Sequence, residues 1–223
     1  GMMVLQLAED IIDRKNTDSD RHYADISEID MEEDAYAYRD GKIVRTKPFS
    51  HKIWRSWPEN DMRPVMLCEH AHDEPVYVAF NADTYFKGCK NAYFKYGGVG
   101  IRFSEPLYRA GLLSWKEEEV DGQKVIPHDL ILKHVPMAPK QPEEIHEIIE
   151  EGVVSDGGAF VVEAYGKKDG KDVMVELHLN APGLVESYEK AKMSGEMYLT
   201  GQGAFLYTKL LVNGLIDQKS LIS

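Results

Sequence analysis

The sequence of 223 residues contains only two cysteines, Cys68 and Cys89, and no long apolar run. Two cysteines cannot build the disulfide framework of a small secreted domain, so they favour a reducing cytoplasm. A membrane-spanning helix needs about 20 consecutive apolar residues, and we expect none here. Basic residues are also scarce, since 26 Lys and Arg stand against 38 Asp and Glu, for a formal net charge of −12. Because a nucleic-acid interface needs clustered Lys and Arg, we expect neither nucleic acid nor a membrane as a partner.

The sequence also lacks a complete fingerprint for binding a dinucleotide. Such a fingerprint consists of a strand, a Gly-x-Gly-x-x-Gly turn that opens a helix, and an acidic residue about 20 positions later. Residues 98–103 and 201–206 each match the first two glycines. Phe103 and Leu206 then stand where a third glycine must let the helix pack closely on the strand. We therefore expect this chain alone to bind no nucleotide cofactor.

The apolar residues that are present, 43% of the chain, can form a full core without disulfides or structural metal ions. Three Asp-Gly pairs, at residues 40–41, 121–122 and 169–170, each lie between short segments that fit hairpin strands. The pair suits a type I′ turn, and the clearest hairpin covers residues 159–179. Hairpins cannot be built into an all-parallel sheet. We therefore predict an α+β fold with a mixed, largely antiparallel sheet and helices packed on one face.

Hydrophobic periodicity predicts the remaining elements. We expect helices over residues 4–14, 103–113, 129–135 and 142–152, and strands over residues 22–30, 64–70 and 75–80. Thr200 is expected to cap a last helix that ends near Gly214. The predicted organisation is an N-terminal helix and connector over residues 2–20, followed by one domain over residues 21–223.

Several segments carry a resemblance to a known family. Residues 166–171 read Gly-Lys-Lys-Asp-Gly-Lys, the pair Thr200-Gly201 precedes an apolar helix, and residues 211–216 read Leu-Val-Asn-Gly-Leu-Ile. With Tyr-Arg-Asp-Gly-Lys-Ile-Val at residues 38–44, they resemble the C-terminal domain of the saccharopine dehydrogenase family. The resemblance implies the substrate-binding and dimerisation domain of an NAD(P)-dependent oxidoreductase of amino-acid metabolism, acting on lysine-type or polyamine-type substrates.

The same resemblance has consequences for activity and partners. The nucleotide-binding half of the family is absent from this sequence, so we expect it to be missing or on a separate polypeptide. The chain is then not active alone, and NAD(P) would be held by the partner. The resemblance also implies a homodimer. Where related dehydrogenases often read Tyr-Pro-Gly-His, this chain has Gly97 and Val99 at the proline and histidine positions, so no histidine contact is carried over.

An oxidoreductase acting on an amino acid needs cations for the substrate carboxylates and a proton donor near the reacting nitrogen. The candidates beside glycine-rich, hairpin or helix-start positions are Lys95, Tyr96, Arg102, His178 and Thr200. No catalytic residue is singled out among them. The alternative for each is an ordinary surface residue or, for Tyr96, a core aromatic.

Two other functions stay open. One is a non-catalytic ligand-binding or regulatory protein that binds a lysine-like or polyamine-like molecule without NAD(P). The other is a small zinc protein, because Cys68, His70 and His72 would lie on one face of an extended strand and could present ligands to zinc. The alternative for this group is the partly exposed end of a strand, since no fourth ligand stands at a standard spacing.

Overall fold

The computed structural model describes residues 2–14, 34–57, 64–97, 99–134, 139, 141–179 and 182–216. The chain divides into two compact units. The first contains Gly1–Ile11, Ser19–Ala138 and Gly158–Asn180, and the second contains Ile12–Asp18, Pro139–Gly157 and Ala181–Ser223. The predicted boundary after residue 20 stays a prediction, and Met2–Arg14 form a strand of the main sheet.

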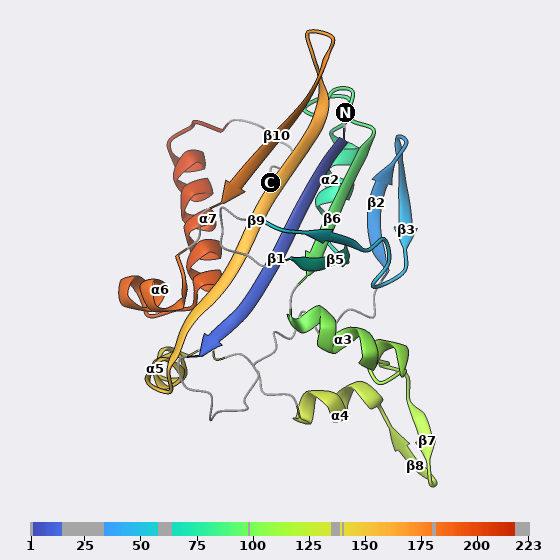
Figure 1. Cartoon of the computed structure of the whole chain (residues 1–223), viewed down its shortest axis with the longest axis vertical. Helices are drawn as coiled ribbons and strands as arrows, with labels where there is room; N and C mark the ends of the chain where they lie inside the picture. The colour runs from blue at the N-terminus through green and yellow to red at the C-terminus, as the bar shows by residue number, and fades with distance from the viewer. Residues whose placement is uncertain are drawn as a thin grey trace. The chain divides into compact units, whose positions relative to one another are not determined.

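Five strands precede the first described helix, and strands and helices are mixed along the rest of the chain (Figure 1). The strands are β1 (Met2–Arg14), β2 (Ala35–Arg39), β3 (Lys42–Thr46), β4 (Ile53–Arg55), β5 (Val65–Glu69), β6 (Asn91–Gly97), β7 (Glu118–Val120), β8 (Gln123–Val125), β9 (Val153–Lys168) and β10 (Lys171–Leu179). The helices are α2 (Glu74–Phe80), α3 (Val99–Arg109), α4 (Pro127–His134), α5 (Pro142–Glu150), α6 (Leu184–Ala191) and α7 (Gly195–Val212).

The main sheet is mixed and mostly antiparallel, as predicted. Its strand order is β10-β9-β1-β6-β2-β3, with β5 also paired to β6 and β4 paired to β5. β1 runs parallel to β6, whereas β2 and β5 run antiparallel to it. β1 pairs along the whole length of β6, while β2 pairs near its start and β5 near its end. Two strands therefore share one edge of β6, and the α+β prediction is confirmed.

The three predicted Asp-Gly hairpins are all present. They join β2 to β3, β7 to β8 and β9 to β10 in antiparallel register. Both turn residues have positive φ in every case, as a type I′ turn requires: Asp40 (49°), Gly41 (79°), Asp121 (51°), Gly122 (78°), Asp169 (53°) and Gly170 (77°). The predicted strand at residues 64–70 is confirmed as β5, and the three predicted helices between residues 103 and 152 correspond to α3, α4 and α5.

Three predicted elements differ from the structure. Residues 4–14 form a strand, since seven residues of β1 from Met2 to Ala8 pair with β6, and such long-range pairing overrides a weak helical period. Residues 75–80 form α2, because Pro75 suits the first turn of a helix. The last helix begins before Thr200, since Ser194 accepts a hydrogen bond from the backbone N–H of Met197.

The remaining predictions concern Thr200, Gly214 and residues 22–30. Thr200 consequently lies inside α7 and is exposed, so it caps no helix. Gly214 follows the end of that helix with a φ of 66°, as expected of a helix terminus. The strand predicted over residues 22–30 lies outside the described residues.

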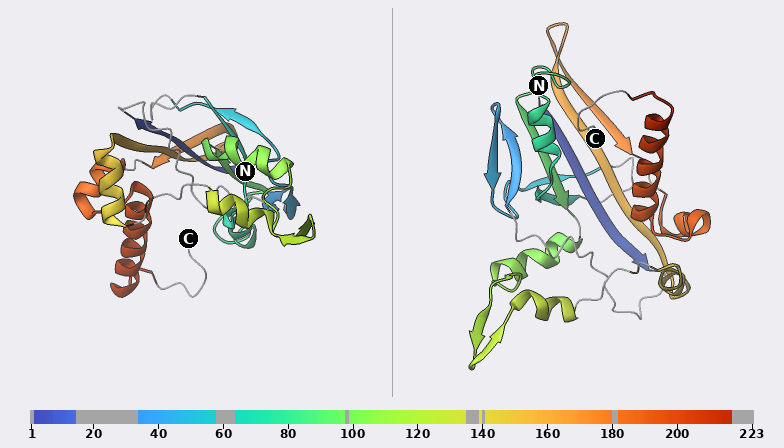
Figure 2. Two further views of the ribbon diagram at one scale, coloured as in Figure 1. Left: turned by 90° about the horizontal axis from the view of Figure 1, so that it is seen from below. Right: turned by 180° about the vertical axis from the view of Figure 1, so that it is seen from behind.

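The two faces of β6 have different environments within the first unit. Ala92 packs with α2, and Phe94 and Tyr96 pack with Ile101 of α3, so both helices cover the same face of the strand (Figure 2). On the opposite face, β4 and β5 cross in front of β1 and β9 (Figure 1). An apolar cluster fills the contact, with Trp57, Val65 and Leu67 against Ala159 and Val161.

Gly97 lets β5 approach β6 closely. Its register partner is Leu67, and a Cβ built on Gly97 would lie 2.4 Å from the carbonyl oxygen of Met66 and 2.5 Å from Cδ2 of Leu67. A backbone oxygen held in a ladder cannot move aside without breaking the pairing of the two strands. Glycine at this position therefore permits the cross-strand contacts of β5 with β6.

We predict that Gly97→Ala lowers the free energy of unfolding by about 1–3 kcal/mol, the usual cost of overpacking a tight contact. Gly166→Ala is the matched control, because a Cβ on this strand glycine meets nothing within 4 Å. Urea unfolding followed by far-UV circular dichroism measures both variants. Equal midpoints for the two alanine variants would show that the close approach of β5 is not required.

Candidate functional site

Ionisable side chains from three strands gather on the face of β6 that is turned away from α2 and α3. Tyr93 and Lys95 alternate with the helix-facing residues of β6 and so lie on this opposite face. Glu69, the last residue of β5, is the register partner of Lys95 and shares its face. Arg39 is the last residue of β2. The residue before it, Tyr38, pairs with Ala92 on the helix-facing side of β6, so Arg39 projects to the opposite face together with Lys95.

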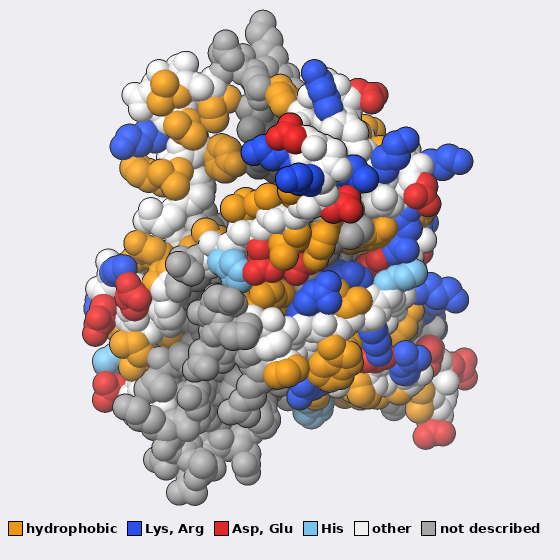
Figure 3. Space-filling model, turned by 45° about the horizontal axis from the view of Figure 1, so that its top comes forward, with side chains coloured by type: hydrophobic (Ala, Val, Ile, Leu, Met, Phe, Trp, Pro, Cys, Tyr) orange, Lys and Arg blue, Asp and Glu red, His pale blue; other side chains and the backbone are white. Residues whose placement is uncertain are grey.

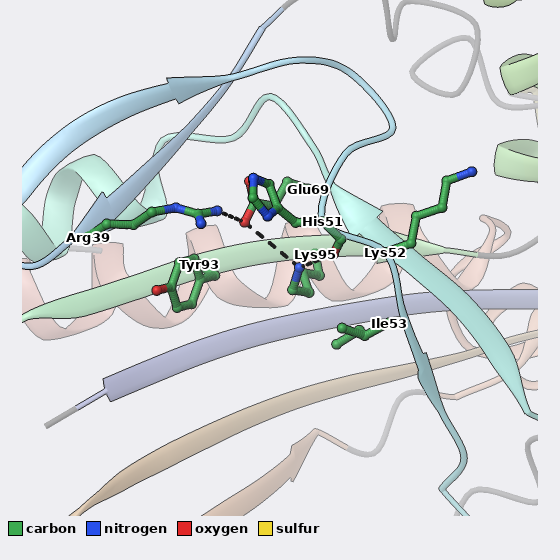
Figure 4. A pocket seen from close by; sticks show the side chains of 7 residues that line it. All are labelled: Arg39, His51, Lys52, Ile53, Glu69, Tyr93 and Lys95. Carbon is green, nitrogen blue, oxygen red and sulfur yellow. Dashed lines mark hydrogen bonds and ion pairs between the residues drawn. The ribbon is translucent and has the colours of Figure 1, made fainter.

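Glu69 is at the centre of these side chains (Figure 4). The guanidinium of Arg39 donates a short hydrogen bond to Oε1 of Glu69. The Nζ of Lys95 lies 3.8 Å from the same oxygen and donates a 2.6 Å hydrogen bond to the backbone carbonyl of His51. The side chains of Glu69 and Lys95 are only 2% and 8% exposed, so these charges interact with little screening by water.

The buried charges are not balanced. Arg39 and Lys95 carry two positive charges, and Glu69 supplies one negative charge between them. Within the described part of the chain, the buried Nε of Arg39 and Oε2 of Glu69 have no hydrogen-bond partner. Nε2 of His51 lies 3.9 Å from that oxygen, too far for a hydrogen bond. The group therefore keeps one free donor, one free acceptor and an excess of positive charge.

These residues line a cavity of about 280 Å3 in the first unit. Its lining consists of Arg39, His51, Lys52, Ile53, Glu69, Tyr93 and Lys95. In Figure 4 the side chain of Lys52 extends away from the others, and its Nζ binds both carboxylate oxygens of Glu105 at 2.5 and 2.6 Å. The guanidinium of Arg39 lies 4.9 Å from the ring centre of Tyr93, a cation–π contact that supports its position. The volume suits a ligand of small-metabolite size.

Burial changes the acidity of Lys95. Removal of water lowers the pKa of its ammonium below the usual value, and the charge of Arg39 acts in the same direction. Glu69 opposes this shift but does not cancel it. A larger fraction of Lys95 is therefore neutral at a given pH than of an ordinary surface lysine.

A second buried carboxylate lies on β9. Oε1 of Glu163 is 3.5 Å from Nε of Arg55, and Oε2 accepts a 2.6 Å hydrogen bond from the hydroxyl of Tyr165. This hydrogen bond is the largest of the effects that raise the pKa of Tyr165, since loss of the phenol proton would place two negative charges together. Both oxygens of Glu163 thus have partners, in contrast to the free oxygen of Glu69.

The structure separates the five residues predicted to bind substrate. Lys95 lines the cavity, whereas Tyr96, its neighbour, belongs to the apolar core on the helix side. Arg102 is exposed on α3. His178 of β10 lies beside Glu176, with Nε2 2.5 Å from its carboxylate, and Thr200 is exposed within α7. Lys95 is the member of the set that the described structure brings into the cavity.

The proposed zinc ligands also have distinct surroundings. Cys68 is fully buried in the core with Phe94, and His72 stacks on Phe94 at a centroid distance of 3.8 Å. His72 also lies 2.9 Å from the carboxylate of Glu74. Among the described residues, the potential ligand atoms that lie within 4.8 Å of one another are those of His72, Asp73 and Glu74. Cys68 and His70 do not belong to that group, which by itself is no evidence for a metal.

Sequence reasoning missed Arg39, His51, Glu69 and Tyr93 as parts of a site. A signal was available for Glu69, since it ends a strand that is otherwise apolar, and a buried carboxylate requires cationic or hydrogen-bonding partners. The identity of those partners could not be read, because Arg39 and Lys95 lie 30 and 26 positions away in the sequence.

The surface of the molecule does not display a broad basic region on the face drawn in Figure 3. Lys and Arg side chains are interspersed there with acidic and hydrophobic ones. None of the described helices is long and apolar enough to cross a membrane. Comparison with protein-family models finds no family that matches this chain, and comparison with curated proteins finds no significant match.

The burial of Cys68 gives a pH-dependent prediction. Burial, assisted by the charge of Glu105, raises the pKa of its thiol from 9.0 to about 12. Between those values the unfolded chain loses the thiol proton while the folded chain keeps it, so stability falls as pH rises, by at most about 1.4 kcal/mol per pH unit. We expect Cys68→Ala to remove this part of the slope when urea unfolding is measured at pH values above 9.0, the lower of the two pKa values.

Cys89→Ala is the control, because its half-buried thiol lies outside that core and should leave the slope as in the unsubstituted chain. The slope rather than the absolute stability is compared, since truncating a buried side chain also leaves a small void. Identical slopes in the two variants would contradict the buried, protonated thiol.

Proposed function

We propose that this chain is the substrate-binding part of an NAD(P)-dependent oxidoreductase that acts on an amino acid of lysine or polyamine type. The observation that carries the proposal is the cavity in which Arg39 and Lys95 face a single buried carboxylate, Glu69. In this proposal the nucleotide is bound by a part of the enzyme that this sequence does not contain. The chain contributes recognition of the substrate and does not transfer hydride alone.

The charges of the cavity complement an amino acid. A ligand carboxylate can accept hydrogen bonds from the guanidinium of Arg39, whose side chain is 26% exposed, and from Lys95, which neutralises the excess positive charge. A ligand ammonium can donate to the free Oε2 of Glu69. Both ligand charges would thus find partners beside Glu69 and Lys95, whose side chains are buried and for which an unpaired charge is costly.

The resemblance in residues 38–44, 166–171 and 211–216 supports the oxidoreductase part of the proposal. The lack of a third glycine in both partial fingerprints supports the assignment of the nucleotide to another polypeptide segment. A non-catalytic binding protein would need the same cavity. The two functions differ in whether a nucleotide-binding partner exists, which a binding experiment can decide.

The first test is calorimetric titration of the purified chain with lysine, saccharopine, spermidine, NAD+ and NADP+. We expect binding of a carboxylate-bearing amine and no binding of either nucleotide. Arg39→Gln should weaken that binding about 10- to 100-fold, because it removes a charge-assisted hydrogen bond from a buried site. Arg45→Gln on the adjacent strand is the control, since this arginine is 67% exposed and pairs with Asp34.

Each outcome has a distinct meaning. Nucleotide binding by the chain alone would refute the assignment of the nucleotide to another part of the enzyme and make this chain an enzyme in its own right. Equal affinity of the Arg39→Gln and Arg45→Gln variants would refute the assigned cavity. If the affinity for the amino acid does not change when a nucleotide-binding partner is added, the result would favour the non-catalytic alternative.

We also propose that the chain forms a homodimer. Helix α7 carries large exposed apolar side chains on several sides, including Phe205 (60% exposed), Leu206 (54%), Leu211 (56%) and Val212 (81%). A helix that is apolar all round is normally covered by other parts of a protein. Coverage by a second copy agrees with the dimerisation role that the resemblance implies.

Light scattering coupled to size exclusion should therefore give the mass of a dimer. The double variant Leu211→Asp, Val212→Asp should shift the mass to that of a monomer, because charges buried at an interface without partners are costly. Gln202→Asp on the same helix is the control, since it is already polar and exposed. A monomeric unsubstituted chain at micromolar concentration would contradict the proposal.

A further inference from the structure

We propose that Lys95 is a reactive lysine that condenses with a small 2-oxo acid in the cavity and holds it as an imine. The proposal rests on the proposed function in one respect, namely that the cavity binds a small carboxylate. It goes beyond that function because it assigns covalent chemistry to a residue of this chain. The geometry of three groups around the amine supports it.

The first group is the amine itself. Nζ of Lys95 lines the cavity and is fixed by its 2.6 Å hydrogen bond to the carbonyl of His51. A neutral amine can donate one hydrogen to this carbonyl and keep its lone pair available for attack on a carbonyl carbon. The groups that act on its charge are Glu69, Arg39, Arg55 and Cys68, and burial outweighs the stabilising effect of Glu69, so the pKa is lowered.

The second group is Arg39, which can hold the carboxylate of a 2-oxo acid. Its guanidinium lies beside the same carboxylate as Lys95, and its buried Nε has no hydrogen-bond partner among the described residues. Tyr93 lies against the guanidinium and limits its movement. A carboxylate bound there has its adjacent carbonyl carbon within the same cavity of about 280 Å3 as Lys95.

The third group is Glu69, which can carry protons between nitrogen and oxygen. Its Oε2 is buried and free of hydrogen bonds in the described structure, while Oε1 is 3.8 Å from Nζ of Lys95. Proton transfer by a positioned carboxylate typically contributes about 100-fold or more to a rate.

The reaction needs no oxidant or reductant. The lone pair of Lys95 forms a C–N bond as the carbonyl π bond breaks, and one proton passes from nitrogen to oxygen through Glu69, giving a carbinolamine. Glu69 then takes the remaining proton from the nitrogen and gives it to the hydroxyl. The C–O bond breaks, the C=N bond forms and water leaves. The products are an imine and one water molecule, and hydrolysis reverses the reaction.

The test is reductive trapping with pyruvate. The full chain is incubated with pyruvate and cyanoborohydride, which converts an imine into a stable secondary amine whose mass exceeds that of the chain by pyruvate less one oxygen atom. Peptide mapping then locates the modified lysine. We expect one dominant adduct at Lys95, formed faster than adducts at exposed lysines such as Lys90.

Variants separate the roles of the three groups. Lys95→Arg should abolish the dominant adduct, whereas Lys90→Arg should leave it. Arg39→Gln should lower the yield with pyruvate about 10-fold or more but not the yield with acetaldehyde, which has no carboxylate. Glu69→Gln should slow trapping about 100-fold. Peptide mapping of the unsubstituted chain makes the test independent of whether every variant folds.

Three results would overturn the proposal. The first is modification spread evenly over exposed lysines, with Lys95 no faster than Lys90. The second is calorimetric binding of pyruvate without any adduct, which would leave the proposed binding function standing while removing the imine. An absence of both binding and trapping would overturn the imine and count against the cavity as the binding site.

Discussion

The burial of the Glu69 carboxylate is the constraint on which the site depends. A carboxylate that is almost fully removed from water needs cations close by, and it obtains them from two other strands. This requirement links the end of β2 and the end of β5 to the middle of β6. Because the carboxylate has two neighbouring cations, the same arrangement that stabilises it also leaves an excess of positive charge.

The shared edge of β6 makes this arrangement possible. An edge occupied by one continuous strand would place regular cross-strand pairs along it, whereas here β2 and β5 each take one part. β2 ends near the start of β6, where Tyr38 is opposite Ala92, and β5 ends with Glu69 opposite Lys95, so the long side chain of Arg39 spans the distance between the two strand ends to reach Glu69. Gly97 permits the close approach of β5 that brings Glu69 opposite Lys95.

The two faces of β6 differ in chemical character. The face covered by α2 and α3 is apolar and includes Phe94, Tyr96 and Ile101. The opposite face carries Tyr93 and Lys95 beside Glu69. Alternation along a strand with period two is what allows adjacent residues to serve these different purposes. It also explains why Lys95 lines a cavity while Tyr96, predicted for the same role, packs in the core.

The sequence by itself determined the elements whose conformation depends on neighbouring residues. Each Asp-Gly pair adopts positive φ locally, so the three hairpins and the mixed α+β class could be predicted from it. Lys95 could be suspected from the glycines that follow it. Tertiary structure alone decided that residues 4–14 form a strand, because the pairing of Met2–Ala8 with β6 outweighs the helical period of their apolar residues. It also decided the partners of Glu69, because contacts between residues about 30 positions apart depend on strand order and register, which no local pattern encodes.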